Sequence, residues 1–330
     1  MRKIIAYALL VVILSAFVLA SLVQADVKDE DKPLVVVTIS PLYLIAKEVI
    51  GSNAEIHVLA PAGVDPHSYS PTPEDVMMVS SCDLFICIGR EEFLGQLPIP
   101  EHGLILSWDS WINGRVYVKD DNPHYLWLYP PNAKTLATII AEAMSSLDPD
   151  NSNYYAARAE AFAHKINDLD AWLKAVMKDI GNANVVLAGD HFEPLAEWMG
   201  LNISYIIIKG HGGLPGPQRI KDAIIAAKSS RLIIASATQS EGYEGLYAQQ
   251  VSAESGVPVA YVYGIPISMS DSYIDFIKYD VMIIASHLRH NSPISSSTST
   301  SSGDVYMALT ILFASIAVFE GIIISRLKSK

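Results

Sequence analysis

The sequence predicts an α/β protein of two lobes, each a mostly parallel sheet flanked by helices, joined by a long rigid helix and followed by a C-terminal transmembrane helix. Short apolar runs alternate with helical patterns over most of the 330 residues, which is typical of βαβ units. One much longer helical pattern divides these units into two series, and a long apolar run ends the chain. We expect the lobes at 31–149 and 182–291 and the linking helix at 150–181.

The first lobe is expected to begin with a strand at Leu34–Ile39, an apolar run rich in β-branched residues. A helix follows and is expected to end at Gly51. Thr72 is expected to cap a later helix, because Pro73 and Asp75 follow it at the positions that a capping box uses. Further strands are expected at 55–59 and 83–88, and a further helix at 132–146.

The linking helix is predicted over about residues 151–180, with Gly181 at its end. About 30 residues make a rod of roughly 45 Å, which is long for a packed helix and suited to connecting two lobes. Its apolar residues recur at spacings of three and four; they are Tyr154, Phe162, Ile166, Leu169, Leu173, Val176 and Ile180. In the second lobe, strands are expected at 184–188, 203–208, 232–235 and 259–263, and a final helix at 271–287.

Both ends of the chain carry segments that we expect to lie outside the fold. Residues 1–25 predict a signal peptide, with Arg2 and Lys3 before an apolar stretch, although an uncleaved anchor has the same features. Residues 292–303 form a Ser/Thr-rich tract, expected to be a flexible stalk. Residues 305–324 have the length and apolar character of a transmembrane helix, and basic residues follow them. The folded part is therefore expected outside the cytoplasm, held at the cell membrane by a single span.

Composition excludes one class of partner. The chain has 35 acidic and 23 basic residues, a formal net charge of −12, and such a charge repels nucleic acid and favours cations. Cys82 and Cys87 are the only cysteines in the sequence. We expect them to be buried apolar residues that form neither a disulfide framework nor a thiolate zinc site.

Two histidines of the first lobe stand in restricted loops. His67 lies between the strand at 55–59 and the cap at Thr72, in a loop that contains prolines and a glycine. His124 follows Pro123 and precedes apolar residues that would bury a site. Loops after strands are where open α/β sheets bind ligands, and a neutral imidazole is the commonest metal ligand. Both histidines are therefore candidate metal ligands, although a lone loop histidine more often bonds to the backbone.

The second lobe offers a less defined set of candidates. His191 follows the strand at 184–188, and Asp190 stands beside it, so that either residue could be a ligand. His211, in a glycine-rich loop, is a weaker candidate. The residues alone leave the ligands of this lobe open.

The motifs around these residues resemble those of the zinc- and manganese-binding solute-binding proteins of ABC transporters, a family that includes streptococcal lipoprotein adhesins. The resemblance covers about residues 33–290. It implies two lobes, a rigid helical spine and one metal ion in the cleft between the lobes. It also implies that His67 and His124 are the two ligands of the first lobe. The motifs that carry it are residues 37–42, 63–73, 122–128 and 271–273.

The second lobe departs from the pattern of this family. The third ligand of the family, a histidine or glutamate, stands three residues before an aromatic residue, and counting back from Phe192 gives Gly189. A shift of one or two residues brings in Asp190 or His191, of which we favour His191.

The fourth ligand of the family, usually acidic, follows a strand that ends here at Val262, and that place holds Tyr263. A water molecule, Asp190 or Asp271 is left to fill it. Three imidazoles with one open or carboxylate position suit zinc, whereas manganese prefers more oxygen donors. The resemblance therefore implies Zn²⁺, or else Mn²⁺, as the transported ligand.

The function we expect from this resemblance is binding of a metal ion outside the cytoplasm and its delivery to an ABC importer, with the permease and its ATPase as partners. An enzyme is not expected, since the sequence has no HExxH run, nucleophile elbow or P-loop. The alternative left open is a membrane-anchored surface or adhesion protein with the same fold and a weakened metal site.

Overall fold

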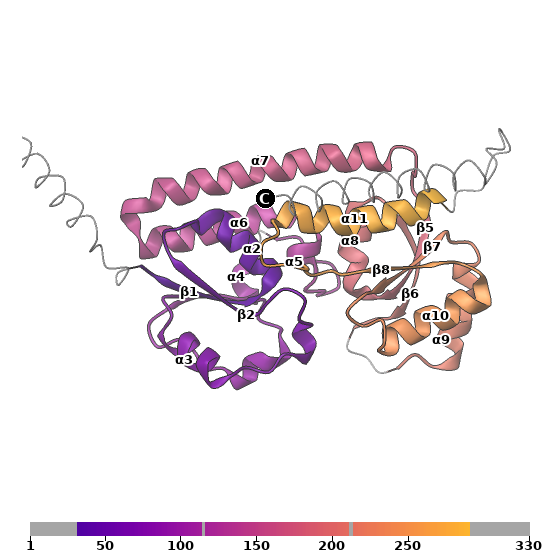
Figure 1. The fold of residues 1–330 in the computed structure, drawn as a ribbon, viewed down its shortest axis with the longest axis horizontal. Coiled ribbons are helices and arrows are strands. Elements are labelled where there is room, and N and C mark those ends of the chain that lie inside the picture. Colours follow the sequence, from indigo (N-terminus) through magenta and orange to yellow (C-terminus); the bar gives the residue numbers. More distant parts are fainter. Residues whose placement is uncertain (1–31, 114–115, 211–213, 291–330) are drawn as a thin grey trace, which may run out of the picture. The chain divides into compact units, whose positions relative to one another are not determined.

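A computed structural model describes residues 32–113, 116–210 and 214–290 (Figure 1). They belong to one compact unit that ends at His290. The predicted signal peptide, stalk and transmembrane helix lie outside the described residues. None of the helices within the described ranges combines the length and the apolar character needed to cross a membrane.

The first sheet consists of four parallel strands in the order β2-β1-β3-β4. The strands predicted at Leu34–Ile39 and 55–59 are confirmed, but the strand predicted at 83–88 is shorter, and β4 was not predicted. The residues of β4 are apolar, but the strand has only three of them, fewer than the run of four or more that predicts a strand, and Leu104 and Ile105 are half-exposed. The bounds are β1 Leu34–Ile39, β2 Glu55–Ala60, β3 Leu84–Ile86 and β4 Leu104–Leu106.

In the first half of the molecule, the part before residue 150, the start of α3 and the end of α2 are confirmed, whereas the short helices α4 and α5 were not predicted. The Thr72 hydroxyl accepts a hydrogen bond from the backbone N–H of Asp75, and the Asp75 carboxylate accepts one from the backbone N–H of Thr72. This capping box starts α3. Gly51, with a positive φ of 62°, ends α2. The bounds are α2 Ser40–Ile50, α3 Pro73–Ser81, α4 Trp108–Ile112, α5 Tyr125–Leu128 and α6 Pro130–Leu147.

The predicted linking helix is present as α7, Ser152–Met177, with 26 residues. It packs against α2 and α6 of the first half and against α11 of the second, and it extends over both halves in Figure 1. The apolar residues that define its pattern face inward, and Phe162, Ile166 and Leu169 are almost fully buried.

The second sheet repeats the topology of the first, with four parallel strands in the order β6-β5-β7-β8. All four strands predicted for this half are confirmed, with ends that differ by one residue. The strands are β5 Asn184–Gly189, β6 Asn202–Ile208, β7 Leu232–Ser236 and β8 Val259–Val262. The helices are α8 Glu193–Trp198, α9 Pro217–Ala227, α10 Tyr243–Ser255 and α11 Tyr273–His290.

The main hydrophobic core is shared by the two sheets. One cluster of buried residues includes Val35 of β1, Phe162 of α7, Leu187 of β5 and Tyr273 of α11. The sequence therefore folds into an α/β structure with two parallel sheets flanked by helices, and the boundaries of the two lobes stay a prediction.

Both cysteines are buried and free, as predicted. Burial raises the pKa of the Cys82 thiol to about 11 and raises the pKa of Cys87 further.

Candidate metal centre

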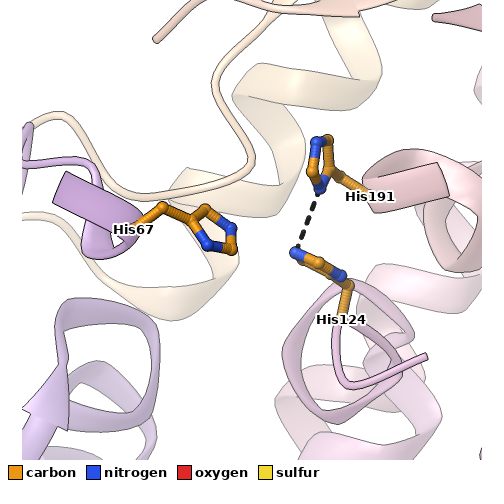
Figure 2. A group of neighbouring side chains, drawn as sticks. All are labelled: His67, His124 and His191. Carbon is orange, nitrogen blue, oxygen red and sulfur yellow. Dashed lines mark hydrogen bonds between the residues drawn. The ribbon is translucent and has the colours of Figure 1, made fainter. Parts of the chain in front are cut away.

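Three histidines from distant parts of the chain converge on one point (Figure 2). His67 lies in a 3₁₀ helix, Pro66–Ser68, after β2; His124 directly precedes α5; His191 lies in a 3₁₀ helix, Asp190–Phe192, after β5. One ring nitrogen of each lies within 4.8 Å of the others. His67 and His191 thus follow parallel strands, where open α/β sheets bind ligands, and His124 reaches the same point from the start of α5.

The backbone beside His67 is fixed by its own loop. The Asp65 carboxylate accepts a hydrogen bond from the backbone N–H of His67 at 3.0 Å, and Pro66 restricts the residue between them. Gly63 has a φ of 78° and donates its N–H to the carbonyl of Pro266 at 3.1 Å. The loop of the first half is therefore tied to a segment of the second half.

His124 presents its Nε2 to the centre. Its Nδ1 lies 2.8 Å from Oδ1 of Asn122, and the same oxygen accepts the backbone N–H of His124 at 3.0 Å. Because this oxygen is an acceptor, Nδ1 of His124 carries the proton and Nε2 carries the lone pair. Asn122 in turn donates from Nδ2 to the backbone carbonyl of Asp190 at 2.9 Å, which joins the two halves beside the site.

His191 presents the other ring nitrogen, Nδ1, which lies 3.3 Å from Nε2 of His124 (Figure 2). Its Nε2 lies 2.9 Å from Oε2 of Glu244, a side chain that is 2% exposed. Burial lowers the pKa of His191, but the hydrogen bond and negative charge of Glu244 outweigh burial, so the pKa is raised above its usual value.

The facing nitrogens of His124 and His191 create a site for a cation. The 3.3 Å contact is a hydrogen bond when His191 is protonated on both ring nitrogens. When both rings are neutral and their outer nitrogens donate to Asn122 and Glu244, two lone pairs face each other across the same distance. A metal ion between them replaces repulsion with coordination. Tetrahedral zinc, with Zn–N bonds of about 2.0–2.1 Å, places two nitrogens about 3.3–3.4 Å apart. The observed separation of these two nitrogens fits that geometry.

The surroundings of the imidazoles are apolar on one side and polar on the other. The apolar wall of the pocket includes Ile39, Trp127, Leu128 and Phe192, and the Trp127 ring centroid lies 4.9 Å from that of His124. An apolar wall excludes water and strengthens the attraction between a metal and its ligands.

Asp190, predicted as a further ligand, lies beside the site but points elsewhere. Its Oδ2 accepts the backbone N–H of Gly210 at 2.6 Å. Asp271 likewise accepts the backbone N–H of Ser268 at 3.0 Å. In the described part of the chain, the converging ligand atoms come from the three histidines alone. His211 lies outside the described residues.

Glu244 is the member of the site that the sequence did not reveal. It is the second residue of α10, far from His191 in sequence, and a glutamate in the first turn of a helix is common. Gly189 offers an indirect signal, since it occupies the place where the resemblance expects a ligand. A Cβ at this residue would lie 2.7 Å from Oε2 of Glu244 and 2.9 Å from Cδ2 of His191.

Two ion pairs connect the halves near the polar side of the site. Lys119 Nζ lies 2.6 Å from Oε1 of Glu193, and Lys209 Nζ lies 2.9 Å from Oδ2 of Asp120. Asp120 and its neighbour Asp121 have φ values of 53° and 54°, which are uncommon for residues other than glycine. The segment that precedes His124 is thus held to the second half by charge as well as by Asn122.

Comparison with known proteins finds a matching family model and several similar proteins. The family model described as zinc-uptake complex component A, periplasmic (ZnuA) matches residues 35–287. The manganese-binding lipoprotein MntA of Halalkalibacterium halodurans is 24% identical over 276 residues, covering 79% of this chain and 90% of the relative. The manganese ABC transporter substrate-binding lipoprotein PsaA of Streptococcus pneumoniae is 25% identical over 303 residues, covering 85% and 97%. The high-affinity zinc uptake system protein ZnuA of Bacillus subtilis is 26% identical over 199 residues, covering 54% and 61%.

Solved structures share the fold. The solute-binding protein FpvC of P. aeruginosa, in complex with Ni²⁺, aligns with a TM-score of 0.67 at 21% identity, covering 80% of this chain and 99% of that one. The Mn-bound periplasmic metal binding protein of Candidatus Liberibacter asiaticus aligns with a TM-score of 0.64 at 24% identity, covering 78% and 100%. At these identities the likeness concerns the fold alone.

Proposed function

Since the chain belongs to the periplasmic zinc-uptake (ZnuA) family, and so is a metal-binding substrate-binding protein of an ABC transporter and not an enzyme, we propose that its ligand is zinc in preference to manganese. Membership implies a permease and an ATPase as partners and a metal ion as cargo. We propose further that the ion is held by His67, His124 and His191 and handed to the permease outside the cytoplasm.

The observation that carries the zinc proposal is the pair of inward nitrogens of His124 and His191, 3.3 Å apart, with both outer nitrogens engaged. The converging group in the described residues offers imidazole nitrogens and no carboxylate. Imidazole suits zinc, whereas manganese is better served by oxygen donors. The relatives are named for both manganese and zinc, so the preference rests on the ligand atoms of this chain.

The fourth coordination position is proposed for a water molecule. Asp190 is the alternative, because it lies beside the site, but its carboxylate would have to give up the hydrogen bond that it accepts from the N–H of Gly210. His67 also has to approach its partners, since ligand nitrogens up to 4.8 Å apart are wider than the spacing of about 3.3 Å within a tetrahedral zinc site. Metal binding is therefore expected to tighten the loop that carries His67.

The proposed attachment to the membrane rests on the sequence. We propose that residues 1–25 are a signal peptide, that 305–324 span the membrane and that 292–303 form the stalk between span and fold. The relatives MntA and PsaA are named lipoproteins. In this proposal a protein helix anchors the chain, and the lobes at 31–149 and 182–291, joined through 150–181, lie outside the cytoplasm.

Calorimetric titration of the full chain in detergent, stripped of metal, tests the proposed function. Zinc is expected to bind with a Kd below about 1 µM, manganese more weakly, and His67→Ala and His191→Ala are each expected to abolish tight zinc binding. His164→Ala, an exposed histidine of α7, is the matched control and is expected to bind as the parent does.

Loss of binding in His67→Ala but not in His191→Ala would move the third ligand to Asp190 or another residue. No zinc or manganese binding by the parent would overturn the proposal. It would favour a surface or adhesion protein with the same fold and a weakened site.

A further inference from the structure

We propose that Glu244 is a positioning residue that fixes the tautomer of His191, so that the metal is bound by Nδ1 of this ring while Nε2 bonds to the carboxylate. This inference rests on the proposed function, because it concerns how one of its three ligands is presented. The contacts of Glu244, the space around it and the position of His124 carry the inference.

The Glu244 carboxylate is held by two N–H groups from two different segments. Oε1 accepts the backbone N–H of Ser236, at the end of β7, at 2.6 Å. Oε2 lies 2.9 Å from Nε2 of His191, and the side chain is 2% exposed. A carboxylate only accepts hydrogen bonds, so Nε2 of His191 is the donor and its proton resides there.

The opposite edge of the ring is then the metal-binding edge. With the proton on Nε2, the neutral imidazole of His191 has its lone pair on Nδ1. This atom faces Nε2 of His124 at 3.3 Å. His124 has the reverse arrangement, with Nδ1 bonded to Asn122. The two histidines are thus expected to bind one metal ion through different ring nitrogens.

Gly189 provides the room for this arrangement. Its φ of −127° is accessible to any residue, so the backbone conformation does not require glycine here. A Cβ would nevertheless lie 2.7 Å from Oε2 of Glu244 and 2.9 Å from Cδ2 of His191, closer than such atoms approach. The absence of a side chain at 189 lets the carboxylate reach the ring.

The ring nitrogen that binds metal can be measured directly with cadmium as the probe. Full-length protein with ¹⁵N-labelled histidine, loaded with ¹¹³Cd²⁺, is expected to show ¹¹³Cd–¹⁵N coupling to Nδ1 of His191 and to Nε2 of His124. Coupling to Nε2 of His191 would overturn the inference, since that nitrogen would then no longer be bonded to Glu244.

Glu244→Gln changes the hydrogen-bonding pattern at nearly constant size. With its carbonyl oxygen on the Ser236 N–H, the amide presents an NH₂ group to His191, so Nε2 has to accept and the proton moves to Nδ1. We expect zinc affinity to fall by about 10- to 100-fold, as for other partners of metal-bound histidines. The Nδ1 coupling of His191 is expected to disappear, and the unfolding temperature of the metal-free protein to change little.

Two more variants separate positioning from general damage. Glu254→Gln removes the same charge from the exposed end of α10 and is expected to leave zinc affinity unchanged. Gly189→Ala keeps the carboxylate but displaces it from the ring, and is expected to weaken zinc binding as Glu244→Gln does. Parent-like affinity and coupling in both Glu244→Gln and Gly189→Ala would overturn the inference.

The outcome also distinguishes this inference from the proposed function. A parent protein that binds neither zinc nor cadmium overturns both. A parent protein that binds zinc tightly, but through Nε2 of His191, overturns only the role of Glu244.

Discussion

The loops at the site are held in different ways in the two halves of the molecule. In the first half the acceptors are local: Asp65 bonds to the N–H of His67, Asn122 to that of His124, and Glu91 to the N–H groups of residues 88–90. Each acceptor lies within three residues of its donor. The two loops that carry His67 and His124 also contain prolines. A site held in this way can be recognised from a short stretch of sequence.

In the second half the acceptors are buried carboxylates of later helices. Glu244 of α10 bonds to the N–H of Ser236, and Asp280 of α11 bonds to the N–H groups of Tyr263 and Gly264. Both carboxylates are buried. The comparison teaches that the second half of the site depends on tertiary structure. Tertiary contacts place the carboxylates of Glu244 and Asp280 beside loops to which no local sequence motif connects them.

The largest effect that would test this difference concerns Asp280. Burial raises its pKa to about 7, although hydrogen bonds from Gly264 and Tyr263 oppose the shift. Because this pKa is above the unfolded value of 3.8, the folded state holds the proton more tightly. The contribution of Asp280 to stability therefore falls as pH rises from about 4 to 7, by up to about 1.4 kcal/mol for each pH unit.

Asp280→Asn removes this dependence, so the variant is expected to gain stability relative to the parent as pH rises from 5 to 8. Urea unfolding of the metal-free full chain at several pH values measures this difference in the free energy of unfolding. Asp168→Asn, at an exposed position of α7, is the control and should track the parent. If the free energy of unfolding had the same pH dependence in Asp280→Asn and the parent, the buried carboxylate of the second half would not make stability depend on pH.

A smaller effect is expected in the first half, at Asn122. Its neutral amide oxygen holds Nδ1 of His124 at 2.8 Å, whereas a carboxylate holds the corresponding nitrogen of His191. Hydrogen bonds to charged groups are roughly twice as strong as neutral ones. Asn122→Ala is therefore expected to weaken zinc binding by about 10-fold, at the lower end of the range for such partners. Competition with a chelator measures it, and a loss larger than that in Glu244→Gln would reverse the comparison.

The smallest effect is expected from the solvent-exposed ion pair of Lys209 and Asp120, which links the two halves. Both side chains are 53% exposed. Exposed ion pairs contribute about 1 kcal/mol or less and are screened by salt. Lys209→Met is expected to change zinc affinity by less than about 3-fold, with the difference vanishing in about 0.5 M salt. A change of 10-fold would mean that charge, and not the buried hydrogen bonds, holds the halves together at the site.

The parts of the fold that the sequence predicts well are those with local causes. Thr72, Pro73 and Asp75 form their capping box where the pattern places it. Seven of the eight strands in the described part of the chain coincide with predicted apolar runs. The exception, β4, has three residues, two of them half-exposed. The loops of His67 and His124 likewise carry the relevant residues within a few positions, so these two histidines stand out as candidate ligands from the sequence, and their role as ligands stays a prediction.

The rest of the site depends on contacts between distant segments. The sequence leaves Asp190 and His191 as neighbouring candidates for the third ligand. Their long-range contacts distinguish them, because Asp190 bonds to Gly210 while His191 bonds to Glu244. Neither partner is near in sequence. The same limit applies to Gly189, whose importance is a matter of the space left for a side chain on another helix.

Tyr273 of α11 completes the core of the first half although it lies near the end of the described sequence, and this affects how the protein can fold during synthesis. This fully buried residue packs its ring on Phe162 of α7 and donates its hydroxyl to the carbonyl of Trp127, next to the candidate metal centre. A growing polypeptide emerges from the ribosome N-terminus first. The hydrophobic core of the first half therefore cannot be completed until α11, one of the last described segments, has been synthesised. A chain arrested before α11 would expose that interior, and the nascent protein is expected to need protection from aggregation until almost all of it has been made.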